Sequence, residues 1–69
     1  MTPTMTYDTA IETYFAMSVE HFDLTDAQLA GRIVRLLAIS AGTDMQAALA
    51  RNLAFHARDL LRVRVAVAS

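Results

Sequence analysis

Two histidines are the residues of this chain whose types best suit acid–base or metal chemistry. His56 stands one helical turn before Asp59, a spacing that suits a base with an orienting acid, or half of a metal site shared between two chains. His21 lies between Glu20 and Asp23, but no further set of ligands matches it. A polar residue that sets the register of a helical seam is the interpretation we favour for His56. The sequence therefore predicts no catalytic residue, no metal site and no cofactor, and a protein that is not an enzyme.

An arginine-rich stripe is the second candidate. Its members, at spacings of four, three and four residues, are Arg51, Phe55, Arg58 and Arg62. On a helix they share one face, and arginine beside an aromatic ring is common where proteins bind one another. The same types also suit phosphate contact and base stacking, or a solvated face with the ring at the edge of the core. We interpret the stripe as a candidate partner-binding surface.

The longest expected helix carries an apolar line with the spacing of a coiled-coil seam. The seam consists of Leu49, Leu53, His56, Leu60, Val63 and Val67. A helix from 43 to 67 would be about 36 Å long, too long for the rest of a small chain to cover. The seam therefore predicts a partner, either a second copy or another protein, in parallel or antiparallel packing.

The apolar periodicity predicts an all-α fold in a single domain, 1–69. Helices are expected over about 7–22, 25–41 and 43–66, with residues 1–5 disordered. The most favoured assembly is a homodimeric helical bundle. The alternation in 62–69 also fits a short strand, although continued helix keeps the seam intact.

Capping signals mark the ends of the second and third helices. Thr25 and Gln28 have capping-box spacing, and Thr43 and Gln46 repeat it. Gly42 is expected to close the second helix as a C-terminal glycine. A turn this short makes the two helices an antiparallel hairpin or a helix-turn-helix corner.

Composition supports association rather than secretion or membrane insertion. Of the 69 residues, 55% are hydrophobic, which is more than a monomer of this size can bury. The chain has no cysteine, no apolar stretch that could cross a membrane and no signal-peptide pattern, so we expect a cytoplasmic protein. The net charge is only −1, but the charges are unevenly distributed along the chain. All six basic residues are arginines, and the first five acidic residues precede all of them.

These patterns indicate a small regulatory protein that binds and modulates or inhibits another protein through helical surfaces. Arginine and alanine usage is typical of a GC-rich bacterial or phage genome, so a phage- or plasmid-encoded modulator of a host protein fits. The alternative is a transcriptional regulator that binds DNA through a helix-turn-helix, for which Ala38 and Gly42 have suitable spacing. Nucleic acid remains the less favoured partner, because a basic binding surface usually accompanies a basic chain.

Overall fold

The computed structural model describes residues 5–68, which form three helices connected by short turns. The helices are α1 (Tyr7–His21), α2 (Asp26–Ile39) and α3 (Met45–Ala68), and the described residues contain no strand. The all-α prediction is confirmed. Disorder is predicted for residues 1–5, of which 1–4 lie outside the described residues. Met5 is described and is half-buried.

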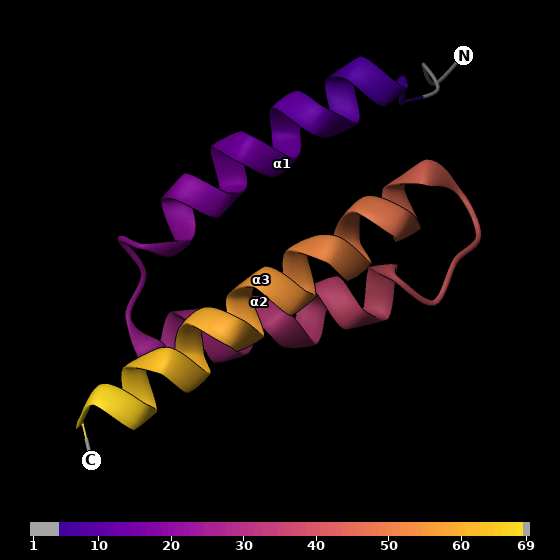
Figure 1. The fold of residues 1–69 in the computed structure, drawn as a ribbon. Helices are drawn as coiled ribbons and strands as arrows, with labels where there is room; N and C mark the ends of the chain where they lie inside the picture. Colours follow the sequence, from indigo (N-terminus) through magenta and orange to yellow (C-terminus); the bar gives the residue numbers. More distant parts are fainter. Residues whose placement is uncertain (1–4, 69) are drawn as a thin grey trace.

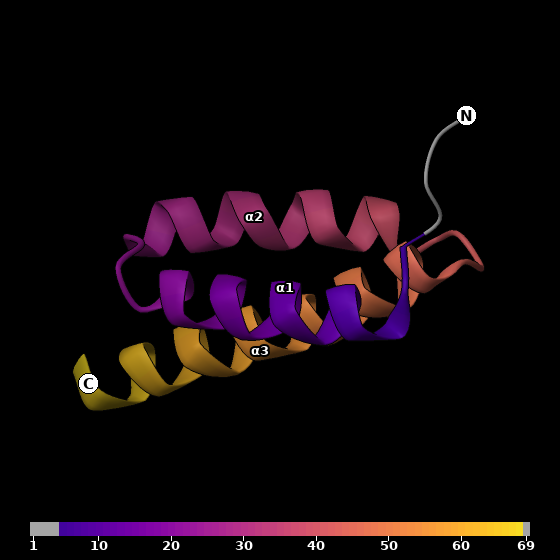
Figure 2. The ribbon, with the colours of Figure 1, turned by 90° about the horizontal axis from the view of Figure 1, so that it is seen from above.

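The helix α3 is the longest element, and both other helices pack against it. Consecutive helices run in opposite directions, so α2 and α3 form an antiparallel hairpin while α1 runs parallel to α3 (Figures 1 and 2). Few contacts join α1 to α2 directly. Of the two geometries considered for the second and third helices, the chain adopts the hairpin and not the helix-turn-helix corner.

The start of α2 follows the sequence signal closely. The Gln28 backbone amide donates to the Thr25 hydroxyl oxygen at 3.2 Å, and the Thr25 amide donates to the Gln28 side-chain oxygen at 2.9 Å. The predicted capping box is therefore confirmed. At the start of α1, the Thr9 amide donates to the hydroxyl oxygen of Thr6, which is the N-cap.

The connection between α2 and α3 differs from the prediction in two respects. Gly42 is predicted to close α2 as a C-terminal glycine, a role that usually requires a left-handed conformation, but no glycine among the described residues has a positive φ. The last turn instead ends at Ser40 in a right-handed helical conformation. The second difference is the cap of α3, which Asp44 supplies in place of Thr43. The Asp44 carboxylate accepts from the Ala47 amide at 2.9 Å, and a carboxylate is a stronger N-cap acceptor than a hydroxyl.

The core is small and rich in alanine. Leu29, Leu53 and His21 are the largest of the fully buried side chains. Where α3 faces the rest of the chain, its buried side chains are mostly small: Ala47, Ala50, Ala54 and Ala57. Small side chains allow close packing of helices but remove little apolar area from water. Much of the apolar surface of the chain therefore stays outside the core.

Arginine side chains connect the helices to one another. Arg64 of α3 donates to the Leu24 carbonyl at 2.7 Å and to the Phe22 carbonyl at 3.1 Å, just beyond the end of α1. The Arg51 guanidinium likewise donates to the Ser40 carbonyl at the end of α2, at 3.2 Å. These positive groups satisfy carbonyl oxygens near helix C-termini, where the helix dipole also favours them.

The C-terminal part of α3 extends beyond the cover of the other helices. Val63 is 58% exposed and Val67 is 82% exposed. Residues 62–68 are helical, so the short strand that their alternation also fitted does not form.

In the described part of the chain, no helix is both long enough and apolar enough to cross a membrane.

Candidate protein-binding groove

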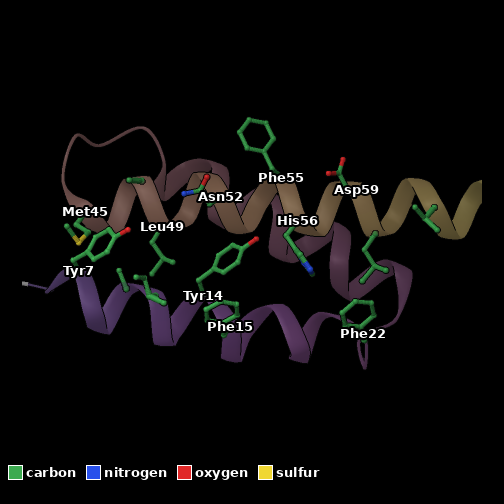
Figure 3. A pocket seen from close by; sticks show the side chains of 15 residues that line it. Tyr7, Tyr14, Phe15, Phe22, Met45, Leu49, Asn52, Phe55, His56 and Asp59 are labelled. Carbon is green, nitrogen blue, oxygen red and sulfur yellow. The ribbon is translucent and has the colours of Figure 1, made fainter.

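An open apolar groove of about 900 Å³ runs between α1 and α3 (Figure 3). The wall formed by α1 and the turn after it includes Tyr7, Ile11, Tyr14, Phe15 and Phe22. The wall formed by α3 includes Met45, Leu49, His56, Leu60 and Val63. In the N-terminal half of α1 the lining residues Tyr7, Ile11 and Tyr14 recur at three or four residues, as on one side of a helix. The α3 wall is apolar at both ends and includes the polar Asn52, His56 and Asp59 between them.

Large apolar side chains of the groove remain in contact with water. Phe15 is 63% exposed, Phe22 is 61% exposed and Phe55, at the outer lip of the α3 wall, is 52% exposed. Exposed aromatic side chains that are grouped in one concave surface are typical of sites that bind another molecule. Singly scattered apolar side chains would not carry this implication.

A pair of histidines lies at the contact between the groove walls. The Nδ1 atoms of His21 and His56 are 2.9 Å apart, so one ring donates this hydrogen bond and the other accepts it. His56 also meets Tyr14 and Phe22 edge-on, with ring centroids 6.3 Å and 5.8 Å away. The imidazole pair and its aromatic neighbours therefore hold the C-terminal half of α1 against α3.

The environment of His21 disfavours its charged form. Burial lowers the pKa of His21 below its ordinary value of 6.5, and the nearby His56 and Arg32 lower it further, while Glu20 opposes them. The side chain has no exposed surface, and its Nε2 atom is buried without a hydrogen-bond partner among the described residues. We therefore assign a structural role to this pair, in which at least one ring stays neutral.

The two outer edges of the groove differ in charge. Asp8 and Glu12 are exposed and, by helical spacing, lie on the side of α1 that faces away from α3. The arginines of the predicted stripe follow the corresponding side of α3, next to Phe55. The Arg58 guanidinium carbon lies 6.0 Å from the centre of the Phe55 ring, within the range of a cation–π contact. The outer side of α1 is thus acidic, whereas the α3 side carries both the arginines, which lie outside the groove, and Asp59, which lines it.

The predicted seam residues have different surroundings. Leu53 is fully buried in the core, while Leu49, His56, Leu60 and Val63 line the groove. Val67 lies beyond the groove, near the exposed end of α3. That these residues contact a second chain stays a prediction.

The predicted arginine stripe is divided between internal and outward contacts. Arg51 is engaged with the Ser40 carbonyl, whereas Phe55 and Arg58 lie together at the lip of the groove. Arg62 is exposed one turn further along α3. The role of the stripe in binding a partner also stays a prediction.

Sequence reasoning missed the α1 wall of the groove and the anchoring role of Arg64. Apolar residues at helical spacing usually pack in a core, so the line Ile11, Phe15, Ser18 and Phe22 favours core packing from the sequence alone, although Ile11, Phe15 and Phe22 line the groove. A signal that could have corrected this is the large number of aromatic side chains on α1 compared with the small area that a 69-residue core can bury.

The described residues were also searched for side chains that could bind a metal ion together. They contain no group of three or more histidine, cysteine, aspartate or glutamate side chains placed to hold a metal ion.

In comparisons with known proteins, no family model matched the chain, and no significant match was found among curated proteins or solved structures.

Proposed function

We propose that this protein is a small non-enzymatic regulator that binds another protein and modulates or inhibits it. The observation that carries the proposal is the open groove between α1 and α3, which leaves several aromatic side chains exposed along one concave surface. Covering such a surface is favourable by about 25 cal/mol for each Å² of apolar area removed from water. The role includes association with a second copy, since the sequence predicts a homodimer.

An amphipathic helix is the partner segment that fits this groove best. The groove is long, open along its length and formed by two parallel helices, so a third helix can lie between them. Such a helix would present apolar residues at three- and four-residue spacing to both walls. The 15 residues of α1 correspond to about 22 Å, or about four turns of a bound helix.

The charged edges give the bound helix an orientation. A segment with basic residues on the side that meets α1 would match the acidic edge formed by Asp8 and Glu12. Charge complementarity of this kind favours one orientation and excludes partners with the wrong pattern. Arg58 supports this selectivity, because its stacking on Phe55 keeps a positive charge at the lip of the groove.

A non-enzymatic role is consistent with how the polar side chains of the groove region are used. The two imidazoles bind each other, and Arg64 binds carbonyl oxygens at the end of α1. These contacts stabilise the fold. We therefore propose that the activity is binding alone, and that a modulated partner supplies any chemistry.

Site-specific photo-crosslinking in extract of the cells of origin would test this function. Benzoylphenylalanine in place of Phe55 lies at the groove, and the same group in place of Val34, which is 68% exposed on α2, serves as the matched control. We expect position 55 to crosslink a protein that makes the product heavier than two copies of the 7.6 kDa chain. Position 34 should not give this product.

If the partner binds in the groove, the crosslinked product from position 55 must depend on an intact groove. Adding Ile11→Glu, which places a charge in the α1 wall, should abolish the heavier product from position 55. Equal yields from positions 55 and 34, or a product from position 55 that never exceeds two copies of the chain, would contradict the proposed function.

A further inference from the structure

The charged side chains nearest the groove between α1 and α3 are acidic. Asp59 is the carboxylate that lines the groove, and no arginine of the described residues lines it. On the opposite wall, Asp8 and Glu12 are exposed and, by helical spacing, lie beside Phe15. The arginines of the predicted stripe lie further round α3, so a segment bound in the groove meets mainly negative charge.

The carboxylates beside the groove are not used inside the chain. The ion pairs of the described residues are formed by acids that do not line the groove, and they join Glu20 to Arg32 and Asp26 to Arg64. Within the described part of the chain, the carboxylates of Asp8, Glu12 and Asp59 form neither an ion pair nor a hydrogen bond. They are therefore available to pair with positive groups of a ligand.

The outer lip of the α3 wall combines an aromatic ring with one of these carboxylates. Asn52, Phe55 and Asp59 follow one another there at spacings of three and four residues. The side chains of Phe55 and Asp59 point to the same side of α3 (Figure 3). This pair suits a lysine or arginine side chain, whose apolar stem can pack on the ring while its charged end pairs with the carboxylate and stays in water.

Arg58 favours the groove side of the ring for such a contact. Its guanidinium carbon lies 6.0 Å from the centre of the Phe55 ring. By helical spacing, Phe55 lies between Arg58, on the outer side, and Asp59, on the groove side. Because the Arg58 charge repels a second cation on the outer side, a basic side chain of a bound segment is favoured next to Asp59.

The carboxylates lie at different levels along the groove. His56, one turn before Asp59, bonds to His21 at the end of α1, so Asp59 is close to the level of that end. Glu12 lies about 14 Å before His21 along α1. A bound helix therefore meets negative charge on the α1 side near one end of the groove and on the α3 side near the other.

We propose that the groove binds a cationic amphipathic helix. One lysine or arginine side chain of this helix packs on Phe55 and pairs with Asp59. A second basic side chain faces the carboxylates of Asp8 and Glu12. This inference rests on the proposed function, because it names the chemical class of the partner that the same groove binds.

Two labelled peptides that differ only in charge test this inference with the full chain. Both have about 15 residues and leucine at three- and four-residue spacing, and the positions beside the leucines carry lysine in one peptide and glutamate in the other. We expect the lysine peptide to bind about tenfold more tightly by fluorescence anisotropy at low salt. This preference should become smaller at about 0.5 M salt, because exposed charges are screened.

Reversal of the charge at the lip tests the position of the contact. Asp59→Lys should weaken binding of the lysine peptide about fivefold, because an attractive contact becomes a repulsive one. Asp23→Lys is the matched control, since Asp23 is an exposed aspartate that does not line the groove, and the same change in net charge should have little effect there. Circular dichroism would check that both variants keep their helices.

The apolar walls should contribute to the same binding. Phe15→Asn keeps the net charge but removes an aromatic contact from the α1 wall, so it should weaken both peptides. A lysine peptide that keeps its full affinity for this variant would be bound by charge alone, outside the groove, and the inference would be wrong.

Further results would also overturn the cationic helix. These are binding of neither peptide, equal binding of both, and equal effects of the two lysine substitutions. If the affinity for both peptides falls as the chain concentration rises, a second copy occupies the groove instead.

These outcomes are separate from the crosslinking that tests the proposed function. If position 55 crosslinks another protein while the two peptides bind alike, the regulator stands and the cationic helix is removed. If the lysine peptide binds as expected but no other protein is crosslinked, the charge preference of the groove stands and the regulator is removed.

Discussion

His21 and His56 share one hydrogen bond between Nδ1 atoms, and this bond fails when both rings are protonated. Burial, together with His56 and Arg32, lowers the pKa of His21, so the folded chain binds fewer protons than the unfolded chain as the pH falls through 6.5. The free energy of unfolding therefore rises with pH in this window. The stabilisation is present above about pH 7 and is lost as the pH falls.

We predict a lower urea midpoint at about pH 5.5 than at about pH 7.5, at constant protein concentration. His21→Leu removes the buried titrating group, so its midpoint should change less between these pH values. Carboxylates titrate mainly at lower pH and affect both proteins alike. An unchanged pH dependence in the variant would show that His21 is not the group responsible.

Arg64 stabilises the end of α1 through several acceptors at once. Its guanidinium donates to the carbonyls of Phe22 and Leu24 and to the Asp26 carboxylate. Arg64→Met keeps the apolar stem but removes these bonds, and we expect a loss of about 2 kcal/mol in the free energy of unfolding by urea titration. The exposed Asp26 pair contributes little of this.

The matched control for Arg64 is Arg35→Met, because Arg35 is exposed on α2 and does not line the groove. Its substitution should change the free energy of unfolding by less than about 0.5 kcal/mol. Similar losses for the two variants would mean that a general effect of arginine, and not the binding of these carbonyls, stabilises the fold.

At the scale of the helices, the N-caps are local and the sequence predicts them best. Thr25 and Gln28 form their capping box because both partners lie within one turn of chain. The same pattern at Thr43 was misleading, since Asp44 is an equally close and stronger acceptor. Local spacing identifies that a helix starts, but two adjacent cap residues leave its first residue ambiguous.

Substitution of the adjacent residues tests which one caps α3. Asp44→Ala should cost about 1 kcal/mol in the free energy of unfolding, because the Ala47 amide loses its acceptor. Thr43→Ala should cost less than about 0.5 kcal/mol. If chemical denaturation ranks the two in the opposite order, the cap described for α3 is wrong.

Contacts between helices are the part that the sequence could not predict. His21 and His56 are 35 residues apart, and the Arg64 contact to Leu24 spans 40 residues. Periodicity indicates which side of each helix is apolar, but it does not say which apolar sides meet. For α3, two apolar strips lie next to each other, and the alanine strip proved to face the core.

At the scale of the molecule, three helices of this length do not cover their own apolar surface. The alanine-rich core brings the helices close together, whereas the larger aromatic side chains of α1 lie in the groove. If α1 were a simple core helix, Phe15 and Phe22 would be buried, but both are more than 60% exposed. Their exposure is the observation on which the proposed binding, to a second copy or to a partner helix, rests.

The measurement that tests this account most directly is the thermal unfolding midpoint at two protein concentrations a hundredfold apart. If covering the groove stabilises the fold, the higher concentration adds about 2.7 kcal/mol per dimer, and the midpoint should rise by several degrees. Phe15→Glu should reduce this dependence, because it places a charge in the covered surface. A midpoint of the unsubstituted chain that is the same at both concentrations would contradict the covering of the groove by a second copy, because the open groove would then be stable in the single chain.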